Sequence, residues 1–109
     1  MEETNYTILI AEDDIDIANL IKLYLESDGF HVLIANDGQQ AIDLFNKHHI
    51  DLALLDIMMP KMNGLEVVQQ IRKTNNIPLI IVSARNEDTD KINGLSLGAD
   101  DYIDRKSVV

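Results

Sequence analysis

The feature that most constrains the fold of this chain is a regular alternation between short apolar runs and segments with helical periodicity. Most of the runs are apolar almost throughout, rather than alternating with polar residues. Continuous hydrophobicity over about four to eight residues is typical of a strand buried on both faces, as in a parallel sheet that helices cover. The expected strands are Thr7–Ala11, His31–Ala35, Leu52–Leu55, Leu79–Val82 and the shorter Asp101–Ile103.

Between these runs, apolar residues recur with the period of an amphipathic helix. Gly29 and Gly98 are placed to end the first and fourth helices, and the third ends before Pro78. Strands and helices that alternate with right-handed crossovers predict a doubly wound α/β domain. The expected helical stripes are Ile17, Ile21, Tyr24 and Leu25, with Leu20 beside them; Ala41, Ile42, Leu44 and Phe45 after the Asp37–Gly38 turn; Leu65, Val68 and Ile71; and Ile92, Leu95 and Leu97.

Length and composition favour one domain over residues 1–109 and exclude several classes of protein. The chain has 109 residues and no cysteine, so a disulfide framework, a cysteine-based zinc site and a cysteine nucleophile are excluded. The opening MEETNY lacks the features of a signal peptide, and the apolar runs are far shorter than the roughly 20 residues that span a bilayer. We therefore expect a cytoplasmic protein without a membrane partner. The net charge of −10 repels phosphate backbones, so we expect no binding of nucleic acid by this segment.

Oxygen-bearing side chains follow three of the expected strands at the point where each strand ends. Glu12 and Asp13 follow the first strand, Asp56 follows the third and Ser83 follows the fourth. In an open parallel sheet, ligands bind outside the carboxyl ends of the strands, at a switch point in the strand order. We therefore expect these side chains to share one edge of the sheet. The next acid, Asp14, is interpreted as the cap of the helix that begins near it.

Asp56 is poorly placed to act as a helix cap, because a loop of eight residues follows the third strand before the next helix. A carboxylate at the end of a buried strand is partly desolvated, which costs free energy unless something compensates it. Together Glu12, Asp13 and Asp56 would bring three negative charges within a few ångströms. A cation offsets that repulsion, and a site made only of oxygen ligands favours Mg²⁺.

Other candidate sites have little support in the sequence. The dinucleotide motif GxGxxG, the P-loop motif GxxxxGK[ST] and the nucleophile elbow GxSxG do not occur. Three methionines in the loop after the third strand are interpreted as loop packing, although one of their backbone carbonyls is still a candidate metal ligand: Met58, Met59 and Met62. Three histidines lack metal-ligand spacing and are interpreted as surface or strand-end residues: His31, His48 and His49.

Four segments of the chain form a specific pattern in their order and spacing. They are ILIAEDD, LALLDIMMPKMNGLEVVQQIR, PLIIVSAR and GLSLGADDYI. This pattern resembles the receiver domain of two-component response regulators, and LGADDYI is most similar to regulators whose receiver precedes a winged-helix DNA-binding domain. The resemblance implies a flavodoxin-like parallel sheet of order 2-1-3-4-5. It also implies a phosphorylation switch in signal transduction, which catalyses only its own phosphorylation and dephosphorylation.

The resemblance assigns roles to the residues that match the pattern. Asp56 would accept a phosphoryl group from a sensor histidine kinase, and Ser83 would hydrogen-bond that group. Tyr102 would be the switch aromatic that turns inward when Ser83 moves. Four residues would hold Mg²⁺, with Glu12 bound directly or through water: Glu12, Asp13, Asp56 and the backbone carbonyl of Met58.

The chain departs from the family after its fifth expected strand. The family continues toward Lys-Pro-Phe, where the lysine contacts a phosphoryl oxygen, whereas this chain continues with Arg105 and Lys106. Either residue is the candidate substitute for that lysine, and arginine presents a planar fork rather than a point charge. The fifth helix of the family has no counterpart in the sequence. Part of the stripe on the first helix is then expected to lie in water, and we expect the chain to self-associate.

Two alternatives come from other classes of protein. A metal-dependent phosphohydrolase with an aspartyl phosphate has a second aspartate two residues after the nucleophile, where this chain has Met58. A receiver-like module that binds partners without phosphorylation is favoured by the loss of one of four residues, all of which are present: Glu12, Asp13, Asp56 and Ser83. We therefore predict a receiver whose partners are a sensor histidine kinase and an effector DNA-binding domain fused after it.

Overall fold

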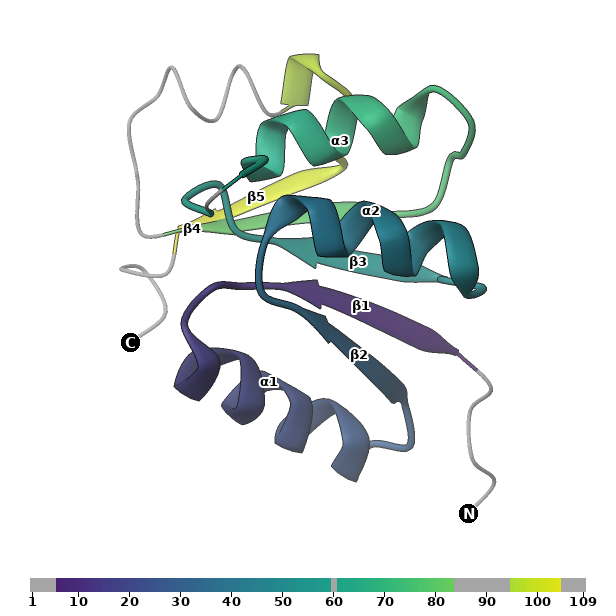
Figure 1. Cartoon of the computed structure of the whole chain (residues 1–109). Coiled ribbons are helices and arrows are strands. Elements are labelled where there is room, and N and C mark those ends of the chain that lie inside the picture. Colours follow the sequence, from purple (N-terminus) through teal and green to yellow (C-terminus); the bar gives the residue numbers. More distant parts are fainter. Residues whose placement is uncertain (1–5, 60, 84–94, 105–109) are drawn as a thin grey trace.

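The computed structural model describes residues 6–59, 61–83 and 95–104, which form a five-stranded parallel sheet with helices on both faces (Figure 1). The strand order is β2-β1-β3-β4-β5, so the expected α/β fold is confirmed. One helix, α1, covers one face of the sheet, and α2 and α3 cover the other (Figure 1). The elements are β1 (Thr7–Ala11), α1 (Ile15–Ser27), β2 (His31–Ala35), α2 (Gly38–Lys47), β3 (Leu52–Leu55), α3 (Gly64–Arg72), β4 (Leu79–Ser83) and β5 (Asp101–Asp104).

The central strand β1 is buried on both faces, as its unbroken apolar run predicts. Leu9 and Ala11 belong to the larger core under α2 and α3, whereas Ile8 and Ile10 belong to the smaller core under α1. All four side chains are at most 5% exposed. Because both faces are buried, the hydrogen bonds between the strands are shielded from water, and the carboxyl ends of the strands are held in fixed register.

The helix α1 begins where the sequence predicts, and Ile21 and Leu25 of its expected stripe pack against the smaller core. Asp14 caps it, with one carboxylate oxygen accepting hydrogen bonds from the amides of Asp16 at 3.0 Å and Ile17 at 3.2 Å. The side chain that meets the sheet most closely is Ala18, which is fully buried. Tyr24 is 65% exposed, so part of the expected stripe lies in water, as predicted.

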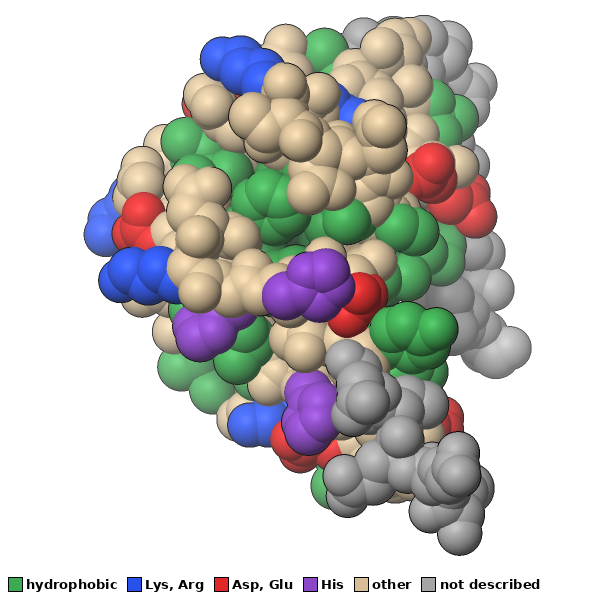
Figure 2. All heavy atoms as spheres, turned by 90° about the vertical axis from the view of Figure 1, so that its right-hand side faces the viewer, with side chains coloured by type: hydrophobic (Ala, Val, Ile, Leu, Met, Phe, Trp, Pro, Cys, Tyr) green, Lys and Arg blue, Asp and Glu red, His purple; other side chains and the backbone are tan. Residues whose placement is uncertain are grey.

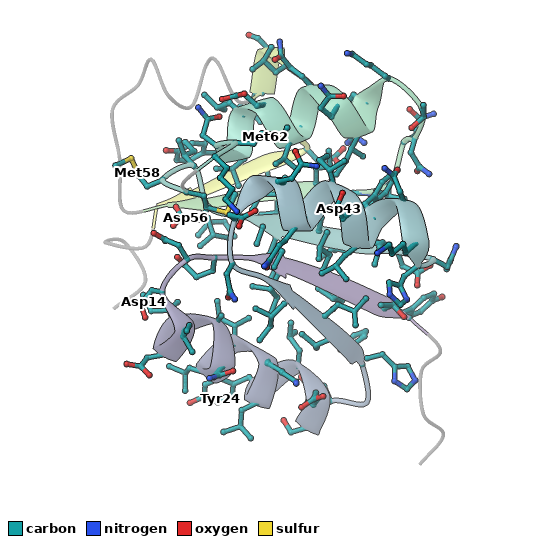
Figure 3. All side chains as sticks on the ribbon, viewed as in Figure 1. Asp14, Tyr24, Asp43, Asp56, Met58 and Met62 are labelled. Atoms are coloured by element: carbon teal, nitrogen blue, oxygen red, sulfur yellow. The ribbon has the colours of Figure 1, made fainter. Side chains whose placement is uncertain are left out.

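Apolar side chains on the outer face of α1 bear on the expected self-association. Leu20, Leu23 and Tyr24 are each more than half exposed, and Tyr24 points away from the sheet (Figure 3). Contiguous exposed apolar residues favour association, since contact between copies removes them from water. Light scattering over a range of protein concentrations should therefore give a mass above that of the monomer, and a constant monomer mass would contradict the prediction.

The fourth expected helix lies mostly outside the described residues, including Ile92. Leu95 and Ser96 are helical, and the chain then turns at Gly98, whose φ of 116° is in the left-handed region that glycine favours. The end of this helix is therefore where the sequence predicts it. Among the residues that the structure describes, every helix is too short or too polar to cross a bilayer.

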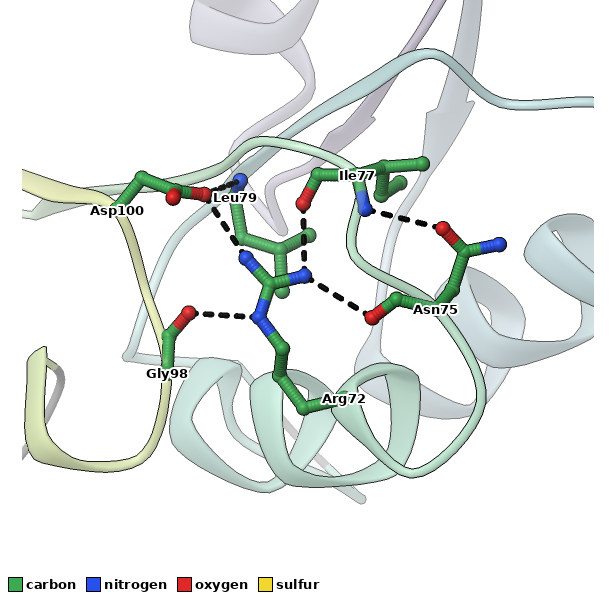
Figure 4. A network of polar contacts seen from close by, with 6 residues as sticks. All are labelled: Arg72, Asn75, Ile77, Leu79, Gly98 and Asp100. Carbon is green, nitrogen blue, oxygen red and sulfur yellow. Dashed lines mark hydrogen bonds and ion pairs between the residues drawn. The ribbon is translucent and has the colours of Figure 1, made fainter.

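The guanidinium of Arg72 joins the end of α3 to the segments that lead into β4 and β5 (Figure 4). Its Nε donates to the carbonyl of Gly98 at 2.7 Å, and Nη1 donates to the carbonyl of Ile77 at 2.7 Å. Nη2 lies 2.8 Å from a carboxylate oxygen of Asp100, which also accepts from the amide of Leu79 at 2.8 Å. The planar guanidinium of this largely buried side chain thus connects three backbone segments, namely the end of α3 and the segments before β4 and β5.

Replacing Arg72 with methionine should lower the free energy of unfolding by about 2–3 kcal/mol, because carbonyl groups and the Asp100 carboxylate lose a charged donor. Arg72→Lys should restore only part of this loss, since a single ammonium cannot reach the same set of acceptors. Urea unfolding followed by circular dichroism measures both differences. Equal stability of the methionine variant and the wild type would contradict the role assigned to the network.

Also at the amino ends of the strands, Asp51 ties the start of β3 to the start of β1. Its carboxylate accepts from the amide of Thr7 at 2.8 Å, and its own amide donates to the carbonyl of Thr7 at 2.9 Å. His49 lies 2.8 Å from the second carboxylate oxygen. Histidine side chains are exposed on the face that Figure 2 shows. The hydrogen bond from Thr7, with a smaller contribution from His49, lowers the pKa of Asp51.

The lowered pKa of Asp51 gives an expected dependence of stability on pH. A carboxyl group with a lower pKa in the folded state stabilises the fold above its unfolded pKa, and this contribution is lost as the pH falls through the folded pKa. Asp51→Asn should therefore lower the melting temperature by a few degrees at pH 7, and the difference from the wild type should shrink below about pH 4. Calorimetry at pH 7 and pH 3 checks this, and a difference that does not depend on pH would contradict it.

Candidate functional site

Three carboxylates meet at the carboxyl ends of β1 and β3. Glu12 and Asp13 follow β1, and Asp56 follows β3, whose last residue pairs with Ala11 in the parallel register. One carboxylate oxygen from each of the three lies within 4.8 Å of the others. The convergence expected from the sequence is therefore confirmed for these three residues, and Asp56 lies at this edge of the sheet in Figure 3.

Backbone hydrogen bonds hold the two buried members of this acidic cluster. The amide of Glu12 donates to the carbonyl of Ala35 at 3.0 Å, and the amide of Asp56 donates to the carbonyl of Ala11 at 2.9 Å. Their side chains are almost fully buried, whereas that of Asp13 is exposed. Two members of the cluster are thus buried and held by backbone hydrogen bonds, and the third faces solvent.

The electrostatics of the acidic cluster favour a cation. Two unit charges about 4 Å apart repel by about 4 kcal/mol at the effective dielectric constant typical near a protein surface. The amide of Asp14 donates to Glu12 at 3.2 Å and the amide of Met58 donates to Asp56 at 3.2 Å, which offsets part of that repulsion. A divalent ion among the three carboxylates would offset far more.

The donor set fits Mg²⁺. This ion takes oxygen ligands at about 2.0–2.1 Å, so oxygens on opposite sides of it lie about 4 Å apart. The carboxylate oxygens of the acidic cluster lie within 4.8 Å of one another, so small side-chain movements would bring them to the spacing of Mg²⁺ ligands. Carboxylate oxygens from three points on a rigid sheet edge leave further positions for a backbone carbonyl, water and a substrate oxygen.

The loop between β3 and α3 forms one wall of the site. It runs over eight residues from Asp56, as expected, and a hollow beside the acidic cluster is lined by Asp13, Ile57, Met58, Met59 and Asn63. The carbonyl of Ile57 accepts from the amide of Met59 at 3.0 Å and from that of Gly64 at 3.2 Å, which closes the loop at its base. Met58 extends away from the sheet and is 56% exposed (Figure 3).

Gly64 allows α3 to start against the backbone of Asp56. A Cβ atom on this residue would overlap the carbonyl oxygen of Asp56 and lie 2.9 Å from its carbonyl carbon. Asn63 caps the helix by accepting from the amide of Glu66 at 3.0 Å. The backbone at the end of β3 and the start of α3 are therefore in direct contact.

The remaining residues expected at the site are only partly described. Ser83 ends β4, two residues after Ile81, which pairs with the last residue of β3, so its backbone lies at the same edge as the acidic cluster. Its side chain, like Arg105 and Lys106, lies outside the described part of the structure. Tyr102 pairs with Ile81 across β4 and β5 and is 8% exposed in the larger core, so it occupies an inward-facing position.

An ion pair beside the loop was not expected from the sequence. Nζ of Lys61 lies 3.5 Å from a carboxylate oxygen of Asp37, which caps α2. The hydrogen bond from the amide of Gln40 is the main cause of the lowered pKa of Asp37, and Lys61 adds to it. A capping acid followed three residues later by Gln40 is a helix-start signal. No local sequence pattern indicates that Lys61 of the loop pairs with Asp37.

Comparisons with known proteins agree with this geometry. A model of the response regulator receiver domain family matches residues 8–108. Transcriptional regulatory protein CpxR of Escherichia coli (strain K12) is 47% identical over 96 residues, which cover 88% of this chain and 41% of CpxR. The Francisella response regulator 1452 receiver domain superposes with a TM-score of 0.87 at 39% identity, over 94% of this chain and 85% of that one. Response regulator protein TrrA from Thermotoga maritima, in complex with Mg²⁺-BeF, has a TM-score of 0.83 at 31% identity, over 92% and 86% of the two chains.

The chain therefore belongs to the response regulator receiver domain family. The resemblance stated from the sequence is confirmed, and so is the strand order that it implied. The chain spans about two fifths of the length of curated relatives such as CpxR, at 41%.

Proposed function

We propose that this chain is a phosphorylation switch in which Asp56 accepts a phosphoryl group from a sensor histidine kinase. The observation that carries the proposal is the acidic cluster at the carboxyl ends of β1 and β3, in a chain of the receiver family. Asp56 belongs to this cluster and directly precedes Ile57, which lines the hollow beside the loop together with Asp13. Asp56 is buried, so its attacking oxygen is positioned without further loss of side-chain entropy.

Glu12, Asp13 and Asp56, with the carbonyl of Met58, are the proposed ligands of Mg²⁺. Glu12 binds it directly or through water. The ion supplies neutralisation of the charge that spreads over the equatorial phosphoryl oxygens during transfer. The complex of TrrA with Mg²⁺-BeF supports this assignment, because that relative shares the fold over most of both chains.

In the proposed step, a carboxylate oxygen of Asp56 attacks phosphorus in line with the leaving group. The bond between phosphorus and the nitrogen of the donor phosphohistidine breaks, and its electron pair stays with the imidazole. The product is an acyl phosphate on Asp56. In hydrolysis, water attacks the same phosphorus, the carboxylate of Asp56 leaves, and inorganic phosphate is released.

The proposed response to phosphorylation involves β4 and β5. Ser83 would hydrogen-bond a phosphoryl oxygen, and its movement would bias the position of Tyr102 on the neighbouring strand. Either Arg105 or Lys106 would supply the cation that the family's lysine provides. The pairing of Ile81 with Tyr102 supports a short route between the two strands.

The relatives support a proposal for the partners of the whole protein. CpxR is named a transcriptional regulatory protein, so we propose a DNA-binding effector domain after this receiver (residues 1–109) and control of transcription as the output. This segment, with a net charge of −10, would not bind nucleic acid itself. The sensor kinase would donate its phosphoryl group in the cytoplasm.

Intact-mass measurement after incubation with acetyl phosphate and Mg²⁺ tests the proposed function. One phosphoryl group should add about 80 Da and about two negative charges. The same incubation with EDTA should leave the mass unchanged. Absence of the added mass under both conditions would favour a binding module, and continuous turnover of acetyl phosphate at enzymatic rates would favour a phosphohydrolase.

A further inference from the structure

The amino end of α2 packs directly against the loop that carries Met58. A Cβ atom on Gly38 would overlap the carbonyl oxygen of Met62 and lie 2.6 Å from its carbonyl carbon. Real Cβ atoms almost never approach other heavy atoms this closely, so any side chain at position 38 would push helix and loop apart. The close approach is between two backbones, and neither can rotate away as a side chain could.

The Asp37–Lys61 ion pair joins the same two segments beside this contact. The carboxylate of Asp37 is only 10% exposed, and its other oxygen is occupied by the amide of Gln40 at 2.8 Å. Lys61 has a φ of 68°, in the left-handed region that residues other than glycine rarely adopt. The ion pair therefore links a strained position of the loop to a carboxylate that is itself held in place.

These contacts fix the outer part of a loop whose base is already fixed. The hydrogen bond from Gly64 to Ile57 closes the base, and the contacts of Gly38 and Asp37 hold the outer part. Between them lies Met58, whose amide donates to Asp56 and which lines the hollow beside Asp13. The distance between the loop and the acidic cluster thus depends on where α2 begins.

We propose that Gly38 and the Asp37–Lys61 ion pair are positioning residues, which hold the loop after β3 so that its backbone completes the metal site formed by the acidic cluster. The inference rests on the proposed function, because it concerns the affinity of that site for Mg²⁺. Groups behind the direct ligands of a metal commonly change its affinity by about 10–100-fold when they are lost. Here that supporting role falls to residues that never touch the ion.

Charge and positioning predict opposite effects when Lys61 is neutralised. Removing a positive charge from the loop beside the acidic cluster makes its surroundings more negative, which by Coulomb's law alone tightens the binding of Mg²⁺. Loss of the positioning contact weakens it instead. The sign of the change in affinity therefore separates the two explanations.

Calorimetric titration with Mg²⁺ alone, on the whole chain, measures this sign. Lys61→Met should raise the dissociation constant by about two- to fivefold, as expected for a partly exposed ion pair. Lys61→Arg should stay within about twofold of the wild type, because it keeps the charge. Gly38→Ala should raise the dissociation constant by about tenfold or more. Lys47→Met is the matched control, since it removes the same charge from the exposed far end of α2 and should leave the affinity unchanged or slightly tighter.

Unchanged or tighter binding in Lys61→Met would overturn the proposal, and this variant decides it if Gly38→Ala does not fold. Amide NMR shifts of Met58 and Asn63 in EDTA give a second measurement that needs no metal. Both should move in Lys61→Met and Gly38→Ala but not in Lys47→Met, and unmoved shifts would overturn the proposal. If the wild type does not bind Mg²⁺, the proposed function fails, and these metal-free shifts alone then decide whether α2 positions the loop.

Discussion

Replacing Asp56 with asparagine should abolish phosphorylation by acetyl phosphate. Asparagine has nearly the same size and shape, so the packing of this almost fully buried position is kept. An amide oxygen is a far weaker nucleophile than a carboxylate, and it cannot form a stable acyl phosphate. The added mass of about 80 Da should therefore fall from a substantial fraction of the protein to none.

The matched control for this experiment is Asp14→Asn, which makes the same chemical change two residues from Glu12. Asn caps helices about as well as Asp, so α1 should keep its start and the labelling should stay close to that of the wild type. Peptide mapping after borohydride reduction locates the acyl phosphate. Full labelling of Asp56→Asn, at any other residue, would contradict the assignment of the acceptor.

The strands could be predicted from sequence because their burial is a local pattern. The ends of β1, β2 and β3 are the expected ones, and β4 and β5 each extend one residue further, to Ser83 and Asp104. The strand order was not contained in that pattern. Runs that are apolar on both faces can pair with any neighbour, so the order came from the family resemblance.

The acidic cluster could be predicted for a different reason. Parallel strands bring their carboxyl ends to one edge, so residues at sequence positions far apart, such as Asp13 and Asp56, must converge. The contact between Gly38 and Met62 has no such rule behind it. It depends on the path of two loops, which apolar periodicity does not describe.

The buried face of α1 could be predicted in part from the hydrophobicity pattern. Ile21 and Leu25, two members of the expected stripe, pack against the core under this helix, whereas Tyr24 lies largely in water. The fully buried residue of the helix is Ala18, which the pattern did not single out. A pattern based on large apolar side chains passes over a small residue of this kind.

Mg²⁺ should stabilise the wild-type chain, and Asp13→Ala should remove this response. An ion that binds only the folded state stabilises it by mass action, which at ten times its dissociation constant amounts to about 1.4 kcal/mol. For a domain of this size that raises the melting temperature by about 5–10 °C. Asp13 is the exposed member of the acidic cluster, so its loss opens the site without leaving a cavity in the core.

The same variant should behave in the opposite way without metal. Removing one of three carboxylates relieves repulsion in the acidic cluster, so Asp13→Ala should melt at or slightly above the wild-type temperature in EDTA. Asp43→Ala, which removes an exposed acid on α2 away from the acidic cluster, should keep the full response to Mg²⁺. Calorimetric melting of the three proteins with Mg²⁺ and with EDTA gives all six values. A full Mg²⁺ response in Asp13→Ala would place the metal elsewhere, whereas a lost response with an unchanged or raised melting temperature in EDTA is what an acidic metal site at this edge of the sheet requires.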